Sequence, residues 1–271
     1  MRVKLVLALI FALAAGARAG NKGSCVKVID RAKAAVSQLG KTGFGTVHAE
    51  VGMIAKGKKS SFSRDLDAGT YCLFAVTEET LMMGVEISAS DAKGKSLKKK
   101  EGVGEAFIAE FAVEAKGQVK LELEVNDAVK NDPGSYIFVL LQKAESANPS
   151  DIVFERLGDR AKAVEDAGHE VVWAELDTLG GSPWKVTHKL AAGSYAVEVV
   201  SDDEKVKDLE VDFTDGSGKS VAKKEKSKEP KDGHMASLKG DAKDGDAKVT
   251  VTAVFQDGCK DSCAGVLIAK K

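Results

Sequence analysis

Apolar residues recur along this chain with two different spacings, and each spacing predicts a different kind of element. From Val26 to Leu39 the apolar positions follow a period of about 3.6 residues, which predicts an amphipathic helix. Val85, Ile87 and Ala89 alternate with polar neighbours, as do the apolar residues of 119–125, and this alternation predicts strands with one solvated face. The segment Tyr71–Val76 is apolar at every position, which indicates a strand buried on both faces.

The same series of elements occurs twice. Leu66–Glu101 aligns without a gap with Leu190–Glu225, 124 residues later, and 13 of the 36 aligned positions are identical. Short strands at regular spacing, separated by turn residues, are typical of an antiparallel sandwich. We therefore predict a mainly β protein with two tandem antiparallel, jelly-roll-like β-sandwich units, each preceded by a short helix. Further strands are expected at Tyr136–Leu141, Tyr195–Val200, Leu209–Phe213, Val249–Phe255 and Gly265–Ala269.

The first residues have the layout of a cleaved signal peptide. A basic start at Arg2 and Lys4 precedes an uncharged apolar run, Leu5–Ala15, and small residues then flank Arg18 before Gly20. The alternative interpretation is a frayed N-terminal helix of a cytosolic protein. We predict a signal peptide at 1–19, unit one at 20–147 and unit two at 148–271. The protein is then periplasmic or secreted, from a Gram-negative bacterium, and no transmembrane segment is expected.

The charge balance bears on the class of partner. Without residues 1–19 the chain has 37 basic and 41 acidic residues, whereas nucleic-acid-binding domains usually carry net positive charge. We therefore expect no nucleic acid partner.

Two motifs in each half resemble a known family. Ala-Gly-Thr/Ser-Tyr opens a strand at Ala68–Tyr71 and Ala192–Tyr195, and Asp-x-x-Gly-Lys-Ser follows a strand at Asp91–Ser96 and Asp215–Ser220. With the later apolar strands, this resembles the bacterial pre-peptidase C-terminal (PPC) β-sandwich domain, in two tandem copies without the leading helices. The resemblance implies an accessory role in secretion or in substrate or surface association, sometimes with calcium, and no catalysis. Of the family's aspartates at the start of the middle strand, unit two has Asp208, but unit one has Gly84.

Four cysteines in an exported chain suggest two disulfides. Cys259 and Cys263 are close enough to form a small loop before the last strand, where unit one has Asp132–Ser135. Cys25 and Cys72 would then pair and join the first helix to a core strand. The alternative is a redox or metal site, but no histidine accompanies Cys259 in the sequence.

Lysines crowd one hairpin of each unit. The candidate polyanion-binding residues are Lys95, Lys98, Lys99, Lys100, Lys219, Lys223 and Lys224. A duplicated basic surface suits an anionic polymer of the envelope. The alternative is a solvated hairpin whose lysines discourage pairing between sheet edges.

Two further possibilities stay open, and two motifs can be dismissed. Trp173 and Trp184 stack on sugar rings if exposed, or fill the core if buried. Acidic loops at 202–204 and at Asp241, Asp244 and Asp246 suit calcium weakly, so no cofactor is expected. His169-Glu170 lacks the second histidine of a zinc-protease helix, and neither Gly-Lys-Ser has the earlier glycine of a phosphate-binding loop.

No catalytic constellation is recognisable. The sequence therefore predicts an exported, non-catalytic binding or structural module of the bacterial envelope, whose partner is an envelope protein or an anionic polymer. A carbohydrate-binding protein that uses exposed tryptophans is the first alternative, and a divergent hydrolase or its accessory domain is the second.

Overall fold

The computed structural model divides the chain into two compact units, Met1–Ala147 and Asn148–Lys271. The structure describes residues 25–78, 82–103, 106–129, 133–143, 150–179, 183–202, 206–222, 225–226, 235–243, 245–255 and 262–271. The predicted signal peptide, Cys259, Lys223 and Lys224 lie outside these residues. Neither helix among the described residues is long and apolar enough to cross a membrane.

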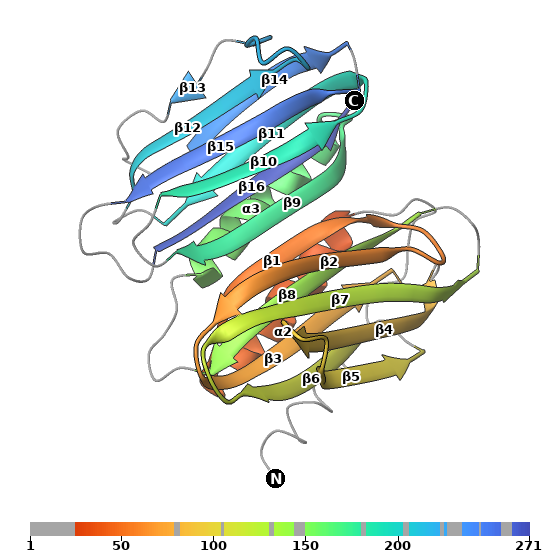
Figure 1. Ribbon diagram of the computed structural model, residues 1–271. Helices are drawn as coiled ribbons and strands as arrows, with labels where there is room; N and C mark the ends of the chain where they lie inside the picture. Colours follow the sequence, from red (N-terminus) through yellow and green to blue (C-terminus); the bar gives the residue numbers. More distant parts are fainter. Residues whose placement is uncertain are drawn as a thin grey trace. The chain divides into compact units, whose positions relative to one another are not determined.

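In the described part of unit 1, a helix is followed by eight strands in two sheets (Figure 1). One sheet has the order β1-β8-β3-β6 and the other β2-β7-β4-β5, with antiparallel neighbours throughout. The elements are α2 (Cys25–Gly40), β1 (Phe44–Ile54), β2 (Lys59–Leu66), β3 (Gly69–Thr77), β4 (Met82–Asp91), β5 (Ser96–Gly102), β6 (Ala106–Val113), β7 (Gly117–Ala128) and β8 (Gly134–Lys143).

Unit 2 repeats this arrangement strand for strand. Its sheets have the orders β9-β16-β11-β14 and β10-β15-β12-β13. The elements are α3 (Ser150–Asp166), β9 (Glu170–Leu179), β10 (Trp184–Leu190), β11 (Gly193–Ser201), β12 (Val206–Thr214), β13 (Glu225–Lys226), β14 (Met235–Ala242), β15 (Ala247–Phe255) and β16 (Ser262–Lys270). Two four-stranded sheets connected in this order form a jelly roll, so the predicted fold class is confirmed for both units.

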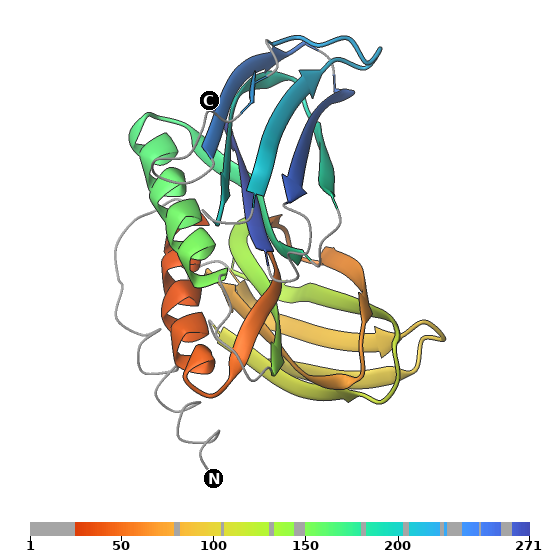
Figure 2. The ribbon, with the colours of Figure 1, turned by 90° about the vertical axis from the view of Figure 1, so that its left-hand side faces the viewer.

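Each helix covers the outer face of the first sheet of its own unit, as Figure 2 shows for α2 and α3. The buried stripe of α2 includes Val28, Ile29, Ala32, Val36 and Leu39, which is the apolar period predicted from the sequence. Gly168 follows helix α3, and its φ of 82° is left-handed. His169 N–H donates to the Val164 carbonyl and Gly168 N–H to the Glu165 carbonyl, so the helix is terminated by a Schellman cap.

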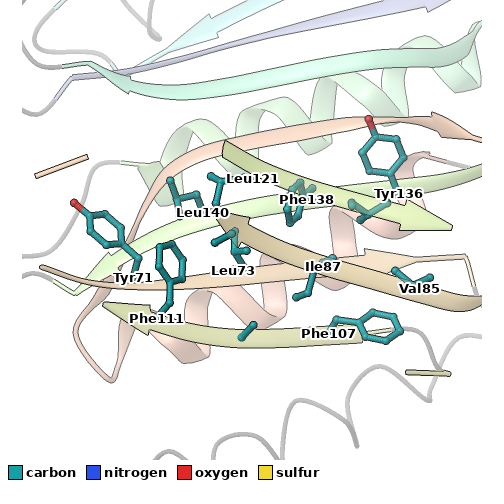
Figure 3. Packing of buried hydrophobic residues seen from close by; sticks show 14 of the residues in the cluster. Tyr71, Leu73, Val85, Ile87, Phe107, Phe111, Leu121, Tyr136, Phe138 and Leu140 are labelled. Carbon is teal, nitrogen blue, oxygen red and sulfur yellow. The ribbon is translucent and has the colours of Figure 1, made fainter. Parts of the chain in front are cut away.

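Because a helix lies on one face and the second sheet on the other, the central strands are buried on both sides. Residues 71–77 of β3 are buried throughout, as predicted. The inner face of unit 1 is filled by aromatic and aliphatic side chains, including Tyr71, Phe111, Phe138 and Leu121 (Figure 3). Tyr71 stacks on Phe111 with ring centroids 5.7 Å apart. Its hydroxyl donates to the Asp67 carbonyl at 2.9 Å, and Tyr195 makes the same bond to Ala191.

Strand registers define which residues occupy equivalent places in the two units. Tyr71 and Tyr195 are counterparts in the gapless repeat, and they lie opposite Phe111 on β6 and Gly240 on β14. Phe111 and Gly240 are therefore counterparts, although they are 129 residues apart. A β-bulge also recurs, at Val47 in β1 and at Val172 in β9. The repeat thus extends beyond the stretch that aligns without gaps.

The Asp-x-x-Gly-Lys-Ser motif is a structural turn in both units. Asp91 Oδ1 accepts the backbone N–H groups of Lys93 and Lys95, each at 2.9 Å. Gly94 takes a left-handed φ of 80°, a conformation that favours glycine. The carboxylate at the start of the turn and the glycine inside it explain the motif without a phosphate ligand.

Candidate ligand-binding cleft

A cavity in unit 2 lies beside the second copy of this turn. Its volume is about 580 Å³, and it is lined by residues 215–216 and 219–222, by the end of β14 with Lys243, and by Ala247 at the start of β15. Volumes of this order are usual for small-molecule and glycan sites. Val221, which is 41% exposed, adds an apolar surface to its wall.

The turn that borders the cleft is held by Asp215. Its Oδ1 accepts the backbone N–H of Ser217 at 2.9 Å, the Ser217 hydroxyl at 2.6 Å and the backbone N–H of Lys219 at 3.0 Å. The Ser217 bond and the Lys219 N–H lower the pKa of Asp215, so its carboxylate stays ionised. The bonds fix the backbone that carries Lys219 at the cleft.

Small residues line the cleft at places where unit 1 has larger ones. Gly240, Ala242 and Ala247 are the counterparts of Phe111, Val113 and Val119 by register. Part of the side-chain volume lost at these positions is filled from the other sheet, because Phe213 on β12 stands where unit 1 has Ala89. A Cβ at Gly240 would lie only 2.4 Å from the Phe213 ring. The aromatic side chain at this place therefore comes from β6 of the first sheet in unit 1 and from β12 of the second sheet in unit 2. Gly240 leaves room for the Phe213 ring.

The charge at the same place is reversed between the units. Lys239 lies opposite Ala196 and Glu110 opposite Cys72, so Lys239 is the counterpart of Glu110. Lys243 likewise follows β14 where Glu114 follows β6. Lys239, Lys243 and Lys219 all line the cleft, all are exposed, and none forms an ion pair within the described part of the chain. The lining aspartates are already bonded, Asp215 to its turn and Asp241 to the Ser194 hydroxyl.

This arrangement suits the binding of negative charge. Three ammonium groups supply donors for carboxylate, sulfate or phosphate oxygens. The described lining residues include no histidine or cysteine that could act as a general base or nucleophile. The Ser220 hydroxyl lies 2.9 Å from the Asp212 carboxylate and 2.7 Å from the Ala222 carbonyl, either of which accepts its one hydrogen, and these contacts fix the turn. The cleft therefore offers electrostatic recognition.

Only Lys219 of the lysines singled out in the sequence lines this cleft. In unit 1, Lys99 bonds Glu86 at 2.9 Å and Glu101 at 2.7 Å, and Lys100 donates to the Ile108 carbonyl at 3.0 Å. Lys95 and Lys98 are exposed and form no ion pair among the described residues. Of the unit 1 candidates, Lys99 alone is neutralised by carboxylates among the described residues, and Lys223 and Lys224 lie outside the described residues. Sequence reasoning missed Lys239, Lys243 and Gly240, because their significance depends on a comparison with residues 129 positions away.

The predicted Cys25–Cys72 disulfide is wrong: no bond joins the two residues. Cys25 Sγ lies against Met53 Sδ at 3.9 Å, whereas Cys72 Sγ lies 3.6 Å from the Leu73 carbonyl of its own strand. Burial, followed by the nearby Glu110 carboxylate, raises the pKa of Cys72 to about 12, so this thiol is unreactive at neutral pH. Cys263 is buried, and because Cys259 lies outside the described residues, the second bridge stays a prediction.

The structure places both tryptophans in packing roles. Trp184 is 6% exposed within the unit 2 core, so the hypothesis that it stacks on sugars is wrong for this conformation. Trp173 is half-buried against the same core and stacks on His188, with centroids 4.3 Å apart and planes inclined by 22°. In unit 1 the equivalent positions hold His48 and Phe62, whose centroids are 4.2 Å apart. An aromatic–imidazole pair therefore joins the two sheets in each unit.

The His188 pair predicts a pH-dependent stability for unit 2. Burial lowers the pKa of His188 below its usual 6.5, so the native state favours the neutral ring and the unfolded state binds the proton more readily. Stability is expected to be full above pH 7.5 and to fall as the pH drops from about 6.5 through the native pKa. His188→Phe, which installs the unit 1 residue, should reduce this loss between pH 7.5 and 5 in thermal unfolding followed by tryptophan fluorescence. An unchanged pH profile in the variant would contradict the assignment.

Two of the acidic residues considered for calcium have partners within the protein. Asp202 is buried and accepts the Cys263 backbone N–H at 3.0 Å, and Asp241 accepts the Ser194 hydroxyl. Residues 203, 204 and 244 lie outside the described residues. Calcium binding stays a prediction.

No family model matches the chain, and no curated protein matches it. Among solved structures, the pre-peptidase C-terminal domain of a Bacillus anthracis collagenase is 14% identical, with a TM-score of 0.29, over 35% of this chain and 88% of that one. A periplasmic inhibitor of g-type lysozyme from Aeromonas hydrophila is 11% identical, with a TM-score of 0.26, over 35% and 88%. The tandem CBM51 modules of a Streptococcus pneumoniae family 98 glycoside hydrolase are 9% identical, with a TM-score of 0.25, over 80% and 83%. At these values the likenesses carry no argument about ligand or mechanism.

Proposed function

We propose that this protein is an exported, non-catalytic binding protein of the bacterial envelope that holds an anionic polysaccharide or lipopolysaccharide in the cleft of unit 2. One observation carries the proposal: three exposed lysines, none of which forms an ion pair among the described residues, line an open cleft, and two of them stand where unit 1 has glutamates. The signal-peptide layout of residues 1–19 supports an exported protein.

The geometry favours a polymer with repeated charges over one small anion. The three lysines are exposed side chains from the turn after β12 and from β14, so they present separate charges along an open surface. Such a surface attracts several anionic groups at once, and the attraction is screened by salt.

Binding of residues 20–271 to immobilised lipopolysaccharide tests the proposal, with neutral dextran as the control surface. Lysines near an anionic surface contribute about 1 kcal/mol each, so Lys219→Ser/Lys239→Ser/Lys243→Ser should weaken binding roughly a hundredfold. Wild-type affinity should also fall with added salt. The matched control is Lys93→Ser/Lys95→Ser/Lys98→Ser in unit 1, which removes the same charge and should change affinity only slightly. Equal losses in the two variants, or full binding in the first, would contradict the assignment to the cleft.

A further inference from the structure

Each unit has one free strand edge at the same place in its first sheet. Strand β6 pairs only with β3, and β14 only with β11, among the described residues. Neither helix packs on these two strands within the described contacts, since α2 lies on β1, β8 and β3, and α3 on β16, β9 and β11. An open edge presents unpaired backbone N–H and C=O groups and is a template for another strand.

The two edges carry opposite charges. Glu110 lies on β6 and Glu114 directly after it. Their counterparts Lys239 and Lys243 lie on β14 and directly after it, and Asp241 between them accepts the Ser194 hydroxyl. All four side chains are exposed, and none forms an ion pair within the described residues. In both pairs the residues are four apart, so along a strand they project to the same side.

Opposite charges determine which edges can meet. Two β6 edges would place glutamates against glutamates, and two β14 edges would place lysines against lysines, and both arrangements are unfavourable. A β6 edge against a β14 edge places unlike charges together. Charged residues on an edge strand usually prevent edge-to-edge pairing with another molecule. Here they disfavour only the pairing of two β6 edges or of two β14 edges.

We propose that the β14 edge of unit 2 binds the β6 edge of unit 1 in a second copy of this chain. In the antiparallel register that sets Glu110 opposite Lys243, Glu114 falls opposite Lys239. Between these ion pairs, Phe111, Ala112 and Val113 fall opposite Ala242, Asp241 and Gly240. The Phe111 and Val113 side chains are buried in their own core, and Ala112 is small beside Asp241, so the outer face leaves room for the approach. The Ile108 carbonyl, which Lys100 already occupies, lies outside this ladder.

The interface joins two different surfaces, so it is heterologous and closes into a ring or continues as an open chain. The inference rests on the proposed function only in that it uses two of the same lysines. An anionic polymer and a second copy therefore compete for the β14 edge. Added lipopolysaccharide should dissociate the assembly.

Sedimentation equilibrium of residues 20–271 at 50 and 500 mM NaCl tests the inference. Wild-type protein should associate in a concentration-dependent, salt-sensitive manner. Glu110→Lys/Glu114→Lys and Lys239→Glu/Lys243→Glu should each weaken association about tenfold or more, and the four substitutions combined should restore it to within about threefold. Circular dichroism confirms that each variant is folded, and Glu110→Gln/Glu114→Gln gives a milder version of the first change.

The outcomes separate this inference from the proposed function. Wild-type protein that stays monomeric at every concentration, or a combined variant as weak as either parent, would overturn the self-association. Lipopolysaccharide binding would then still be tested separately by the substitutions of the cleft lysines. Conversely, Glu110→Lys/Glu114→Lys should retain lipopolysaccharide binding, whereas the combined variant should lose it even as self-association recovers.

Discussion

Gly240→Phe should destabilise unit 2 by about 3 kcal/mol, because even a Cβ at this position would lie 2.4 Å from the Phe213 ring. Phe213→Ala should cost about 3–5 kcal/mol by leaving a cavity in the core. Combined, the two changes install the arrangement of unit 1, in which Phe111 fills the space beside Ala89. Most of the loss should then be recovered, with a coupling free energy of about 2–3 kcal/mol.

Urea unfolding followed by tryptophan fluorescence measures this effect in one unit. Both tryptophans of the chain, Trp173 and Trp184, lie in unit 2, so the emission reports that unit alone. Unit 1 offers a matched control, since Ala89→Phe should crowd Phe111 and leave the fluorescence transition unchanged. Additive losses in the double variant would show that Phe213 and Gly240 do not compensate each other.

Trp184→Ala should destabilise unit 2 by about 3–5 kcal/mol, the usual range for truncating a buried tryptophan. The indole packs in the same core cluster as Val251 and Ala253, so its loss leaves a cavity that water cannot stabilise. Emission from Trp173 follows the transition in the variant. Trp173→Ala is the comparison, and its cost should be smaller because that ring is only half-buried.

The sugar-stacking hypothesis predicts the opposite pattern. If Trp184 served a ligand from the surface, its removal would leave stability unchanged and abolish binding to a glycan. A folded Trp184→Ala variant with wild-type stability would therefore contradict the core assignment.

Several elements could be predicted because their patterns are local. The period of α2, the alternation in β4 and β7 and the fully apolar β3 each follow from burial on one or two faces. Strands β1, β6 and β14 were missed. In β1 the bulge at Val47 shifts the alternation, in β6 residues 106–109 are buried on both faces, and β14 contains Gly240 among charged residues. Ala236, Leu238 and Ala242 of β14 do alternate with polar residues, but small residues at most of the inward positions make this period a weak signal.

The candidate site could not be predicted because it depends on the tertiary pairing. The gapless repeat stops at Glu225, and beyond it the counterparts are 128 or 129 residues apart instead of 124. Only the strand registers reveal that Lys239 replaces Glu110 and that Gly240 replaces Phe111. The lysine clusters were visible in the sequence, but the carboxylates that neutralise Lys99 lie on β4 and β5 and come together only in the sheet.

The exchange of the aromatic residue between sheets also bears on how the chain folds. Tandem units with the same strand order are prone to misfold by trading strands with their neighbour. If β14 took the place of β6, Gly240 would face Ala89 and leave a void. If β6 took the place of β14, Phe111 would collide with Phe213. Exchange of β6 and β14 between the two units is therefore sterically unfavourable in both directions. This disfavours misfolded states in which one unit incorporates the equivalent strand of the other.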